Sequence, residues 1–265
     1  MSAISVNSVF KSYGDTHVLE RVNLNVAEGT FCTMIGASGC GKSTFLRMLL
    51  GQEAPSRGEI LLDGNPLPAE PTPDRGIVFQ RYSVFPNLSV IENLLLAADL
   101  MHGSLAGRIF GSKRREERER AYELLDKIGL RAAEKRYPAQ LSGGMQQRLA
   151  IAQSLMIKPR VLLMDEPFGA LDPGIRDDMQ TLLIDIWREH KMTVFMVTHD
   201  LSEAFKLGTR LIVFDKVRVD PDYPNAYGAT ITYDLDISQA GSQNEKSISD
   251  MIHAAYNKAN NSNDP

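Results

Sequence analysis

The sequence predicts an α/β fold: a mixed β core, an antiparallel β subdomain near its start, and a helical subdomain inserted into the core. Three observations lead to this fold class. Residues 3–35 form short segments whose polarity roughly alternates, as in half-buried strands. Compact apolar runs at 161–167 and 192–200 indicate buried strands further along the chain. Between these groups, from about 89 to 156, the pattern changes to that of helices.

The first part of the chain predicts strands that lead into one helix. Two alternating segments, SVNSVFKSY and VLERVNLNV, are followed by a turn at 27–29 and by the apolar run TFCTMI, which is typical of a buried strand. That run enters the glycine-rich stretch GASGCGKST, and the helical pattern FLRMLLG follows directly. A β pattern returns at 58–80 and ends in GIVFQ.

The helical block contains three predicted helices. The first begins at Ser89, with Glu92 three residues later in the pattern of a capping box. The second, KRREERERAYELLDKIGL, carries Glu116 and Arg120 at the i,i+4 spacing of an ion pair, and its charges are typical of a solvated helix face. The third begins at Ser142.

The rest of the chain returns to α/β alternation. A helix follows the strand at 161–167, with Pro173 near its first position, where proline is favoured. Another buried strand is expected at 211–215. Residues 218–237 indicate a wide hairpin, and a polar helix is expected at 244–259.

Composition limits the classes of function. The chain has 265 residues and a net charge of −4, so it shows no overall electrostatic footprint for nucleic acid. Its two cysteines, Cys32 and Cys40, form no disulfide framework and fit a reducing compartment. The longest unbroken apolar run, 94–98, is too short to span a membrane, and the N-terminus has no signal-peptide pattern. We therefore expect a soluble cytoplasmic protein, which can still sit beside a membrane.

The glycine-rich stretch fits the phosphate-loop pattern G-x-x-x-x-G-K-[ST]. Glycines let successive backbone N–H groups face one anion, and the following helix directs its positive dipole end there. Lys42 would reach the β- and γ-phosphates, and Ser43 would offer a hydroxyl to Mg²⁺. A chance glycine-rich turn before a helix is the alternative. The residues expected to bind ATP in this loop are Gly36, Ala37, Ser38, Gly39, Cys40, Gly41, Lys42, Ser43 and Thr44.

The apolar strand at 161–167 ends in two acids. Asp165 at the end of a buried strand can hold Mg²⁺, and Glu166 can orient or deprotonate an attacking water. Neighbouring strand residues point to opposite sides, so the two carboxylates can have different roles. The alternative is two solvated acids at a strand-to-loop junction.

Residues 141–148, LSGGMQQR, resemble the signature of the nucleotide-binding subunits of ATP-binding-cassette (ABC) transporters. Ser142 can cap a helix, and Gly143 and Gly144 expose its first N–H groups, which makes a second anion site. An ordinary capped helix is the alternative. The resemblance implies a P-loop ATPase fold of ABC type, with ATP and Mg²⁺ as cofactors. It also implies a head-to-tail dimer with a second copy or a paralogous ATPase, in which Ser142, Gly143, Gly144 and Gln146 meet the partner's ATP.

The resemblance covers about residues 3–215, most of the chain. We expect an ATPase domain at 1–220, with its helical subdomain at about 81–157. A C-terminal hairpin, helix and frayed tail are expected at 221–265.

Four more positions match the family, and each also has a simpler structural interpretation. Tyr13 would stack on adenine, or is an ordinary strand tyrosine. Gln80 would touch Mg²⁺ and the attacking water, or is a surface amide. Asp172 would signal across the dimer, or caps the following helix. His199 would contact the γ-phosphate, or is structural. The implied catalytic residues are Glu166, His199 and Gln80, and the implied metal ligands are Ser43, Gln80 and Asp165.

The resemblance implies an ATPase that powers transport through separate integral-membrane permease subunits. Residues 165–172 resemble importer subunits for nitrate, sulfonate and taurine, and 81–93 is where such subunits receive the permease. A solute-binding protein and a peripheral location at the cytoplasmic face of the inner membrane follow from that type. The alternatives are a soluble ABC ATPase acting on nucleic acid or ribosomes, and a P-loop kinase or GTPase. The connection at 102–120 is longer than in compact importers of this type.

The two cysteines are expected to differ in reactivity. Lys42 and the helix N-terminus favour a reactive thiolate at Cys40, which bound MgATP would protect. Cys32 lies in mid-strand and is expected to be buried and slow to react. A Cys40 thiol turned inward and shielded by packing is the alternative.

Overall fold

The computed structural model describes residues 2–79, 84–102, 110–169, 171–218, 220, 222–223, 225–238 and 250. The chain forms two compact units. The first unit comprises residues 1–49, 53–67 and 197–265, and the second comprises 50–52 and 68–196.

One sheet of the first unit is antiparallel. Its strand order is β2-β1-β4-β5, and the strands span Ser2–Tyr13 (β1), Thr16–Ala27 (β2), Arg57–Leu62 (β4) and Asn65–Pro66 (β5). The alternating polarity expected near the N-terminus is present in β2, where Val22, Leu24 and Val26 point to the core while their neighbours are exposed. β2 forms one edge of this sheet.

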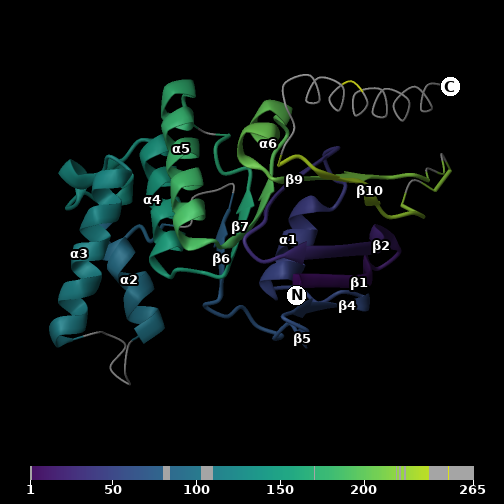
Figure 1. Ribbon diagram of the computed structural model, residues 1–265, viewed down its shortest axis with the longest axis horizontal. Coiled ribbons are helices and arrows are strands. Elements are labelled where there is room, and N and C mark those ends of the chain that lie inside the picture. The colour runs from purple at the N-terminus through teal and green to yellow at the C-terminus, as the bar shows by residue number, and fades with distance from the viewer. Residues whose placement is uncertain are drawn as a thin grey trace. The chain divides into compact units, whose positions relative to one another are not determined.

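The other strands of the first unit surround the glycine-rich stretch. β3 (Phe31–Gly36) is buried along its first five residues and pairs in parallel with β9 (Arg210–Asp215), which pairs antiparallel with β10 (Thr230–Asp236). Two helices accompany them, α1 (Lys42–Leu50) and α6 (Leu201–Leu207), and Figure 1 shows β9 running into the long hairpin with β10. In the described part of the chain, the expected hairpin at 218–237 contributes only its second strand, β10, which pairs with β9 and not with a strand inside that range. The polar helix expected at 244–259 lies outside the described residues except for Asp250.

The second unit combines parallel strands with the helical block. The strand order is β8-β7-β6, from Thr193–Val197 (β8), Val161–Asp165 (β7) and Arg75–Val78 (β6). The helices are α2 (Val90–His102), α3 (Gly111–Lys127), α4 (Gly143–Met156) and α5 (Pro173–His190), with single 3₁₀ turns at Arg131–Ala133 and Pro138–Gln140. α2 packs against both α3 and α4, and α4 contacts β6 (Figure 1).

The helix starts follow the sequence closely. Glu92 accepts hydrogen bonds from the backbone N–H and the hydroxyl of Ser89, at 2.8 and 2.7 Å, so the glutamate half of the capping box forms. Ser142 caps α4 by accepting from the N–H of Met145 at 3.3 Å. Pro173 is the first residue of α5, as expected.

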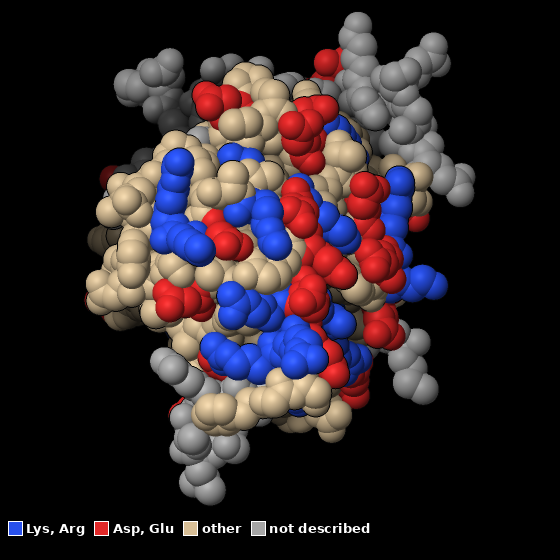
Figure 2. Space-filling model, turned by 90° about the vertical axis from the view of Figure 1, so that its left-hand side faces the viewer, with Lys and Arg blue, Asp and Glu red and all other residues tan. Residues whose placement is uncertain are grey.

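The i,i+4 spacing of Glu116 and Arg120 on the second helix of the block does not produce an ion pair between them. Arg120 pairs with Glu117 at 2.9 Å, at i,i+3, rather than with Glu116. The guanidinium of Arg120 also donates to the backbone carbonyl of Met156 at the end of α4, and this contact turns it to the side of the helix where Glu117 lies. Figure 2 shows the face that carries α3, where Lys and Arg side chains are interspersed with Asp and Glu. This mixture fits a solvated helix face.

No helix in the described part of the chain is both long and apolar enough to cross a membrane.

Candidate functional site

The phosphate-loop motif lies between the end of β3 and the start of α1. Ala37, Ser38 and Gly39 are exposed, so the mouth of the loop is open to a ligand. Gly36 leaves no room for a side chain, because a Cβ there would stand 2.4 Å from the carbonyl oxygen of Phe214. Gly41 has φ +85°, a backbone conformation that glycine adopts without strain.

Lys42 is held by its own loop. The side-chain Nζ donates to the carbonyl oxygens of Gly36 at 2.7 Å and Ala37 at 2.9 Å, and the residue is 8% exposed. Ser43 is exposed, whereas Thr44 is buried and its hydroxyl accepts from Arg47 at 3.1 Å. A side-chain cation, an exposed hydroxyl and the first N–H groups of α1 therefore occur together, and these groups suit a phosphate.

The reactivity expected for Cys40 is wrong. The residue is 3% exposed, and burial raises the pKa of the Cys40 thiol even though Lys42 acts in the opposite direction. Its Sγ would stand 2.8 Å from a Cβ at Gly36, so the thiol turns under the loop rather than toward its mouth. Desolvation of a thiolate is greater here than its attraction to the neighbouring ammonium. Cys32 is buried as expected, and burial raises its pKa to about 12.

Tyr13 ends β1 with its ring 46% exposed. Its hydroxyl donates to Glu53, and the Nζ of Lys11 lies 4.9 Å from the ring centroid. Burial works against ionisation of Glu53, but hydrogen bonds from Tyr13 and Lys11 and the charge of Arg47 lower its pKa overall. The ring is thus held at its hydroxyl end while a large part of its surface remains available for stacking.

His199 follows the end of β8 and is exposed. The preceding residue, Thr198, donates its N–H to the carbonyl of Met34 at 3.1 Å, near the end of β3. The Thr198 hydroxyl donates to Glu203 at 2.5 Å, and Asp200 caps α6. These bonds fix the backbone on both sides of His199 at the carboxyl end of β3, where the phosphate loop begins.

The two acids lie at the end of β7 in the second unit, and both are partly buried. Glu166 has φ +49°, a left-handed conformation that is strained for a residue with a side chain. Its carbonyl accepts from the N–H of Gly169 at 3.3 Å, and Pro167 and Phe168 beside it are buried. Strained residues of this kind cluster at functional sites, where the surrounding structure over-determines them.

The signature residues form the start of α4. Ser142 is exposed, and Gly143 and Gly144 occupy the first turn. The side-chain amide of Gln146 donates to the carbonyls of Pro138 and Leu141, at 3.0 and 3.3 Å, so it anchors the preceding segment. A Cβ at Gly144 would stand 3.3 Å from Leu171.

Asp172 lies directly after Leu171 and is therefore close to the signature within the same unit. It occupies the N-cap position of α5, but its exposed side chain makes no capping hydrogen bond. Asp172 is therefore the N-cap residue of α5, as its plainer interpretation expected, while its carboxylate is not used for capping.

The sequence-predicted residues divide between the units. The phosphate loop, Tyr13 and His199 belong to the first, whereas Asp165, Glu166, Asp172 and the signature belong to the second. Gln80, expected as a catalytic residue and metal ligand, lies outside the described residues.

Four signature residues received no role from the sequence, and two of them, Arg148 and Gln147, are polar groups whose surroundings the structure shows. Arg148 donates to the carbonyl of Ile128 at 2.6 Å, at the end of α3, and burial lowers its pKa. Gln147 is 1% exposed, and neither polar atom of its amide is hydrogen bonded within the described part of the chain. Nothing in the spacing of Gln147 relative to the apolar residues Leu149 and Ile151 indicated that its amide would be buried.

Within the described residues, no group of three or more His, Cys, Asp or Glu side chains is placed to hold a metal ion by itself. The hydroxyl of Ser43 and the carboxylate of Asp165 are oxygen donors of the kind that Mg²⁺ prefers, and both suit an ion that a nucleotide also binds.

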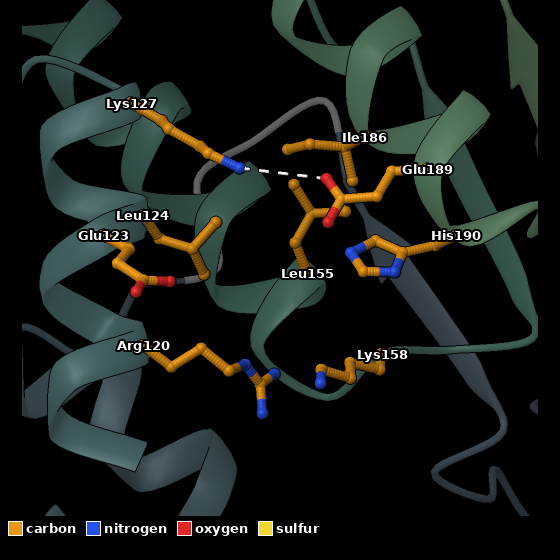
Figure 3. A pocket seen from close by; sticks show the side chains of 9 residues that line it. All are labelled: Arg120, Glu123, Leu124, Lys127, Leu155, Lys158, Ile186, Glu189 and His190. Atoms are coloured by element: carbon orange, nitrogen blue, oxygen red, sulfur yellow. Dashed lines mark ion pairs between the residues drawn. The ribbon is translucent and has the colours of Figure 1, made fainter. Parts of the chain in front are cut away.

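A cavity of about 150 Å³ opens among α3, α4 and α5 (Figure 3). It contains none of the predicted site residues. Lys127 and His190 belong to the last turns of α3 and α5, and Arg120 donates to the last residue of α4. Cations are favoured at helix C-termini, which explains the charge of this cavity without a ligand. Its lining residues are Arg120, Glu123, Leu124, Lys127, Leu155, Lys158, Ile186, Glu189 and His190.

Comparison with known proteins agrees with this geometry. Residues 19–169 match the family model described as ABC transporter. The bicarbonate transport ATP-binding protein CmpD of Synechocystis sp. is 42% identical over 214 residues, covering 79% of this chain and 73% of the relative. The taurine import ATP-binding protein TauB of Rhizobium johnstonii is 43% identical, covering 82% of each.

A solved dimeric ATP-binding cassette in a post-hydrolysis state, bound to ADP and Pi, is 30% identical with a TM-score of 0.72. It covers 88% of this chain, and the match spans 98% of the solved chain. The fold class and the resemblance seen in the sequence are both confirmed. The chain belongs to the ABC transporter family, in which it is an ATP-hydrolysing subunit.

Proposed function

We propose that this subunit powers the import of a small solute through separate integral-membrane permease subunits, at the cytoplasmic face of the inner membrane. The observation that carries the proposal is the phosphate loop, with the Lys42 ammonium fixed on the carbonyls of Gly36 and Ala37 below an exposed mouth. The relatives named for bicarbonate and taurine transport support a small solute, and a partner solute-binding protein accords with import.

The residue roles in ATP binding follow from the chemistry of each group. The N–H groups of Gly36–Thr44 and the Lys42 ammonium bind the phosphates, and the exposed ring of Tyr13 stacks on adenine. The Thr44 hydroxyl accepts a hydrogen bond from Arg47, and we assign the backbone N–H of Thr44 to the phosphates. Ser43, Gln80 and Asp165 would hold Mg²⁺, which would supply positive charge at the phosphates.

Hydrolysis depends on residues that orient water and stabilise charge. The Glu166 carboxylate orients the attacking water and accepts its proton, and its strained backbone keeps the side chain in one direction. Gln80 contacts the same water. His199, held between the Thr198 and Asp200 bonds, donates a hydrogen bond to the γ-phosphate.

The exposed start of α4 is a second anion site. It offers the hydroxyl of Ser142 and the first N–H groups of the helix at Gly143 and Gly144, but no cation. Such a site suits a phosphate that another chain has already fixed, which fits a head-to-tail dimer, and the solved relative is dimeric. Gln146 shapes this site through the segment that it anchors, and the carboxylate of Asp172, which caps no helix, can respond to the partner.

Co-purification tests this function. The tagged chain is isolated from membranes of its own host in mild detergent, and a permease is expected to co-purify. Residues 81–93 are the proposed contact, so Asn87→Arg should reduce permease recovery while the isolated subunit keeps its ATPase activity. Recovery of ribosomes or nucleic acid in place of a permease would contradict the proposal.

A further inference from the structure

The connection between β9 and β10 is long for a hairpin. It spans residues 216–229, whereas antiparallel neighbours are commonly joined by about two residues. Its last part, residues 225–229, which we call the strap, belongs to the same unit as β2 and lies along the edge of β2 that faces away from β1. Covering an edge strand removes a row of unpaired backbone groups.

Three main-chain hydrogen bonds attach the strap to β2. The N–H of His17 donates to Asn225 at 3.1 Å, the N–H of Ala229 donates to Val18 at 2.9 Å, and the N–H of Glu20 donates to Ala229 at 2.8 Å. Leu19 and Ala229 form a parallel bridge. The beginning of the strand β2 is therefore held from both sides, by β1 and by the strap.

The strap approaches β2 too closely for any side chain at Gly228. A Cβ there would stand 2.7 Å from the carbonyl carbon of Leu19 and 2.9 Å from the nitrogens of Leu19 and Glu20. These are backbone atoms, which cannot turn aside. Near the other end of the connection, Arg218 forms an ion pair with Glu20 of β2. Its guanidinium also lies 4.3 Å from the ring centroid of Tyr227 in the strap, so Arg218 links the strap to β2 through side chains as well.

The residues that the strap holds are the ones that contact the phosphate loop. A Cβ at Gly41 would stand 2.8 Å from Leu19 Cδ2 and 2.9 Å from Val18 Cγ1. Gly41 directly precedes Lys42, and its carbonyl accepts the N–H of Phe45 at 2.8 Å in the first turn of α1. A shift of Val18 and Leu19 would thus reach the first turn of the helix that binds phosphate.

We propose that the strap positions the phosphate loop for nucleotide binding, with Gly228 as the positioning residue that permits its close contact with β2. This inference rests on the assignment of residues 36–44 as the ATP phosphate site. Among the described residues, Val18 and Leu19 connect the strap to the loop, so loss of the strap is expected to change nucleotide affinity and to leave the hydrolysing groups in place.

The decisive variant is Gly228→Val, measured for fluorescent ADP binding and for ATPase kinetics. We expect the Kd for ADP and the KM for ATP to rise about tenfold, with kcat at saturating ATP within about twofold of wild type. The reason is that the variant weakens binding equally in the ground state and in the transition state. Val26→Ala is the matched control: it removes a fully buried side chain from the other end of β2 and lowers stability without altering the Kd. Tyr223→Ser, at an exposed position of the same connection, should bind like wild type.

The outcomes separate the inference from the site assignment. If wild type does not bind ADP, the assignment of the phosphate loop fails. If wild type binds and Gly228→Val binds equally well, or if Val26→Ala loses affinity in the same proportion as its stability, the strap has no positioning role. Should Gly228→Val not fold, Gly228→Ala is measured in its place, and a rise in Kd of about twofold to threefold is expected while Tyr223→Ser stays unchanged.

Discussion

The phosphate loop and the signature both lie at the start of a helix, but they are built differently. The loop is closed by short-range bonds, since Lys42 donates to Gly36 and Ala37 within the motif itself. The start of α4 also has local bonds, from Gln146 to Pro138 and Leu141, but its glycine turn packs against a distant residue as well, since Gly144 lies near Leu171.

This difference has a functional meaning. The loop contains its own cation, whereas the described start of α4 offers a hydroxyl and backbone dipoles. Gly144 of the signature packs near Leu171, which directly precedes Asp172. We propose that the loop binds the nucleotide and that the signature senses a phosphate bound by a partner chain.

The largest expected effect tests whether both sites are needed. Lys42→Ala and Ser142→Arg chains should each be inactive alone, the first for lack of the cation and the second because a long side chain fills the signature site. Mixed in equal amounts, they rebuild one complete site per mixed dimer, and partial recovery of ATPase activity is expected. Mixed dimers that form but remain inactive would count against composite sites, unless the two sites of a dimer are strictly coupled.

Glu166→Gln is the next test, because it should separate binding from hydrolysis. The amide can still orient water but accepts no proton, so turnover should fall roughly 10²-fold or more while ATP binding persists. ATP with Mg²⁺ should then trap a dimer, which light scattering detects. If Glu166→Gln hydrolyses ATP at the wild-type rate, Glu166 is not the group that accepts the proton of the attacking water.

A smaller effect tests whether the signature depends on the hydrogen bonds that Gln146 makes to the preceding segment. Gln146→Ala loses the bonds to Pro138 and Leu141, and ATPase activity should fall about threefold to tenfold through misplacement of Ser142. Gln153→Ala is the control, because Gln153 also lies in α4 and the substitution removes a hydrogen bond from its side-chain amide to the carbonyl of Asn93. Each variant should lose about 1 kcal/mol of stability. Equal activity in the two variants would show that the anchor is structural only.

The smallest effects concern the cysteines. Burial raises the pKa of both thiols, so in the folded protein N-ethylmaleimide should label Cys40 and Cys32 far more slowly than in the unfolded chain, with or without MgATP. Cys40→Ala should remain active, because the thiol has no chemical role. Mass spectrometry of the labelled peptides checks this. Rapid labelling of Cys40 in the folded protein would support the reactive thiolate that the sequence predicted.

The pKa of Cys32 also predicts a loss of stability in alkali. The thiol ionises near its ordinary value of 9.0 in the unfolded chain but near 12 in the folded protein. Above pH 9 the unfolded state therefore binds fewer protons, and the free energy of unfolding falls as pH rises. Cys32→Ala should show a shallower fall between about pH 9 and 11, measured by urea unfolding.

Much of the fold could be predicted because its signals are local. The caps at Ser89 and Ser142, Pro173 at the start of α5 and the apolar runs of β3 and β7 each depend on a few neighbouring residues. Arg120 shows where this approach fails: the spacing allowed a pair with Glu116, but a contact with Met156 on another helix selects Glu117.

The phosphate loop, the acidic strand end and the signature could be recognised without a structure, because each is a contiguous run whose chemistry follows from the order of its residues. The state of Cys40 could not, because its burial depends on the packing of the loop against Phe214 and on Gly36. The placement of the strap on β2, where Gly228 meets a strand from the start of the chain, could not be recognised either. Contacts between distant segments depend on how the strands are ordered, and periodicity and motif spacing do not contain that order.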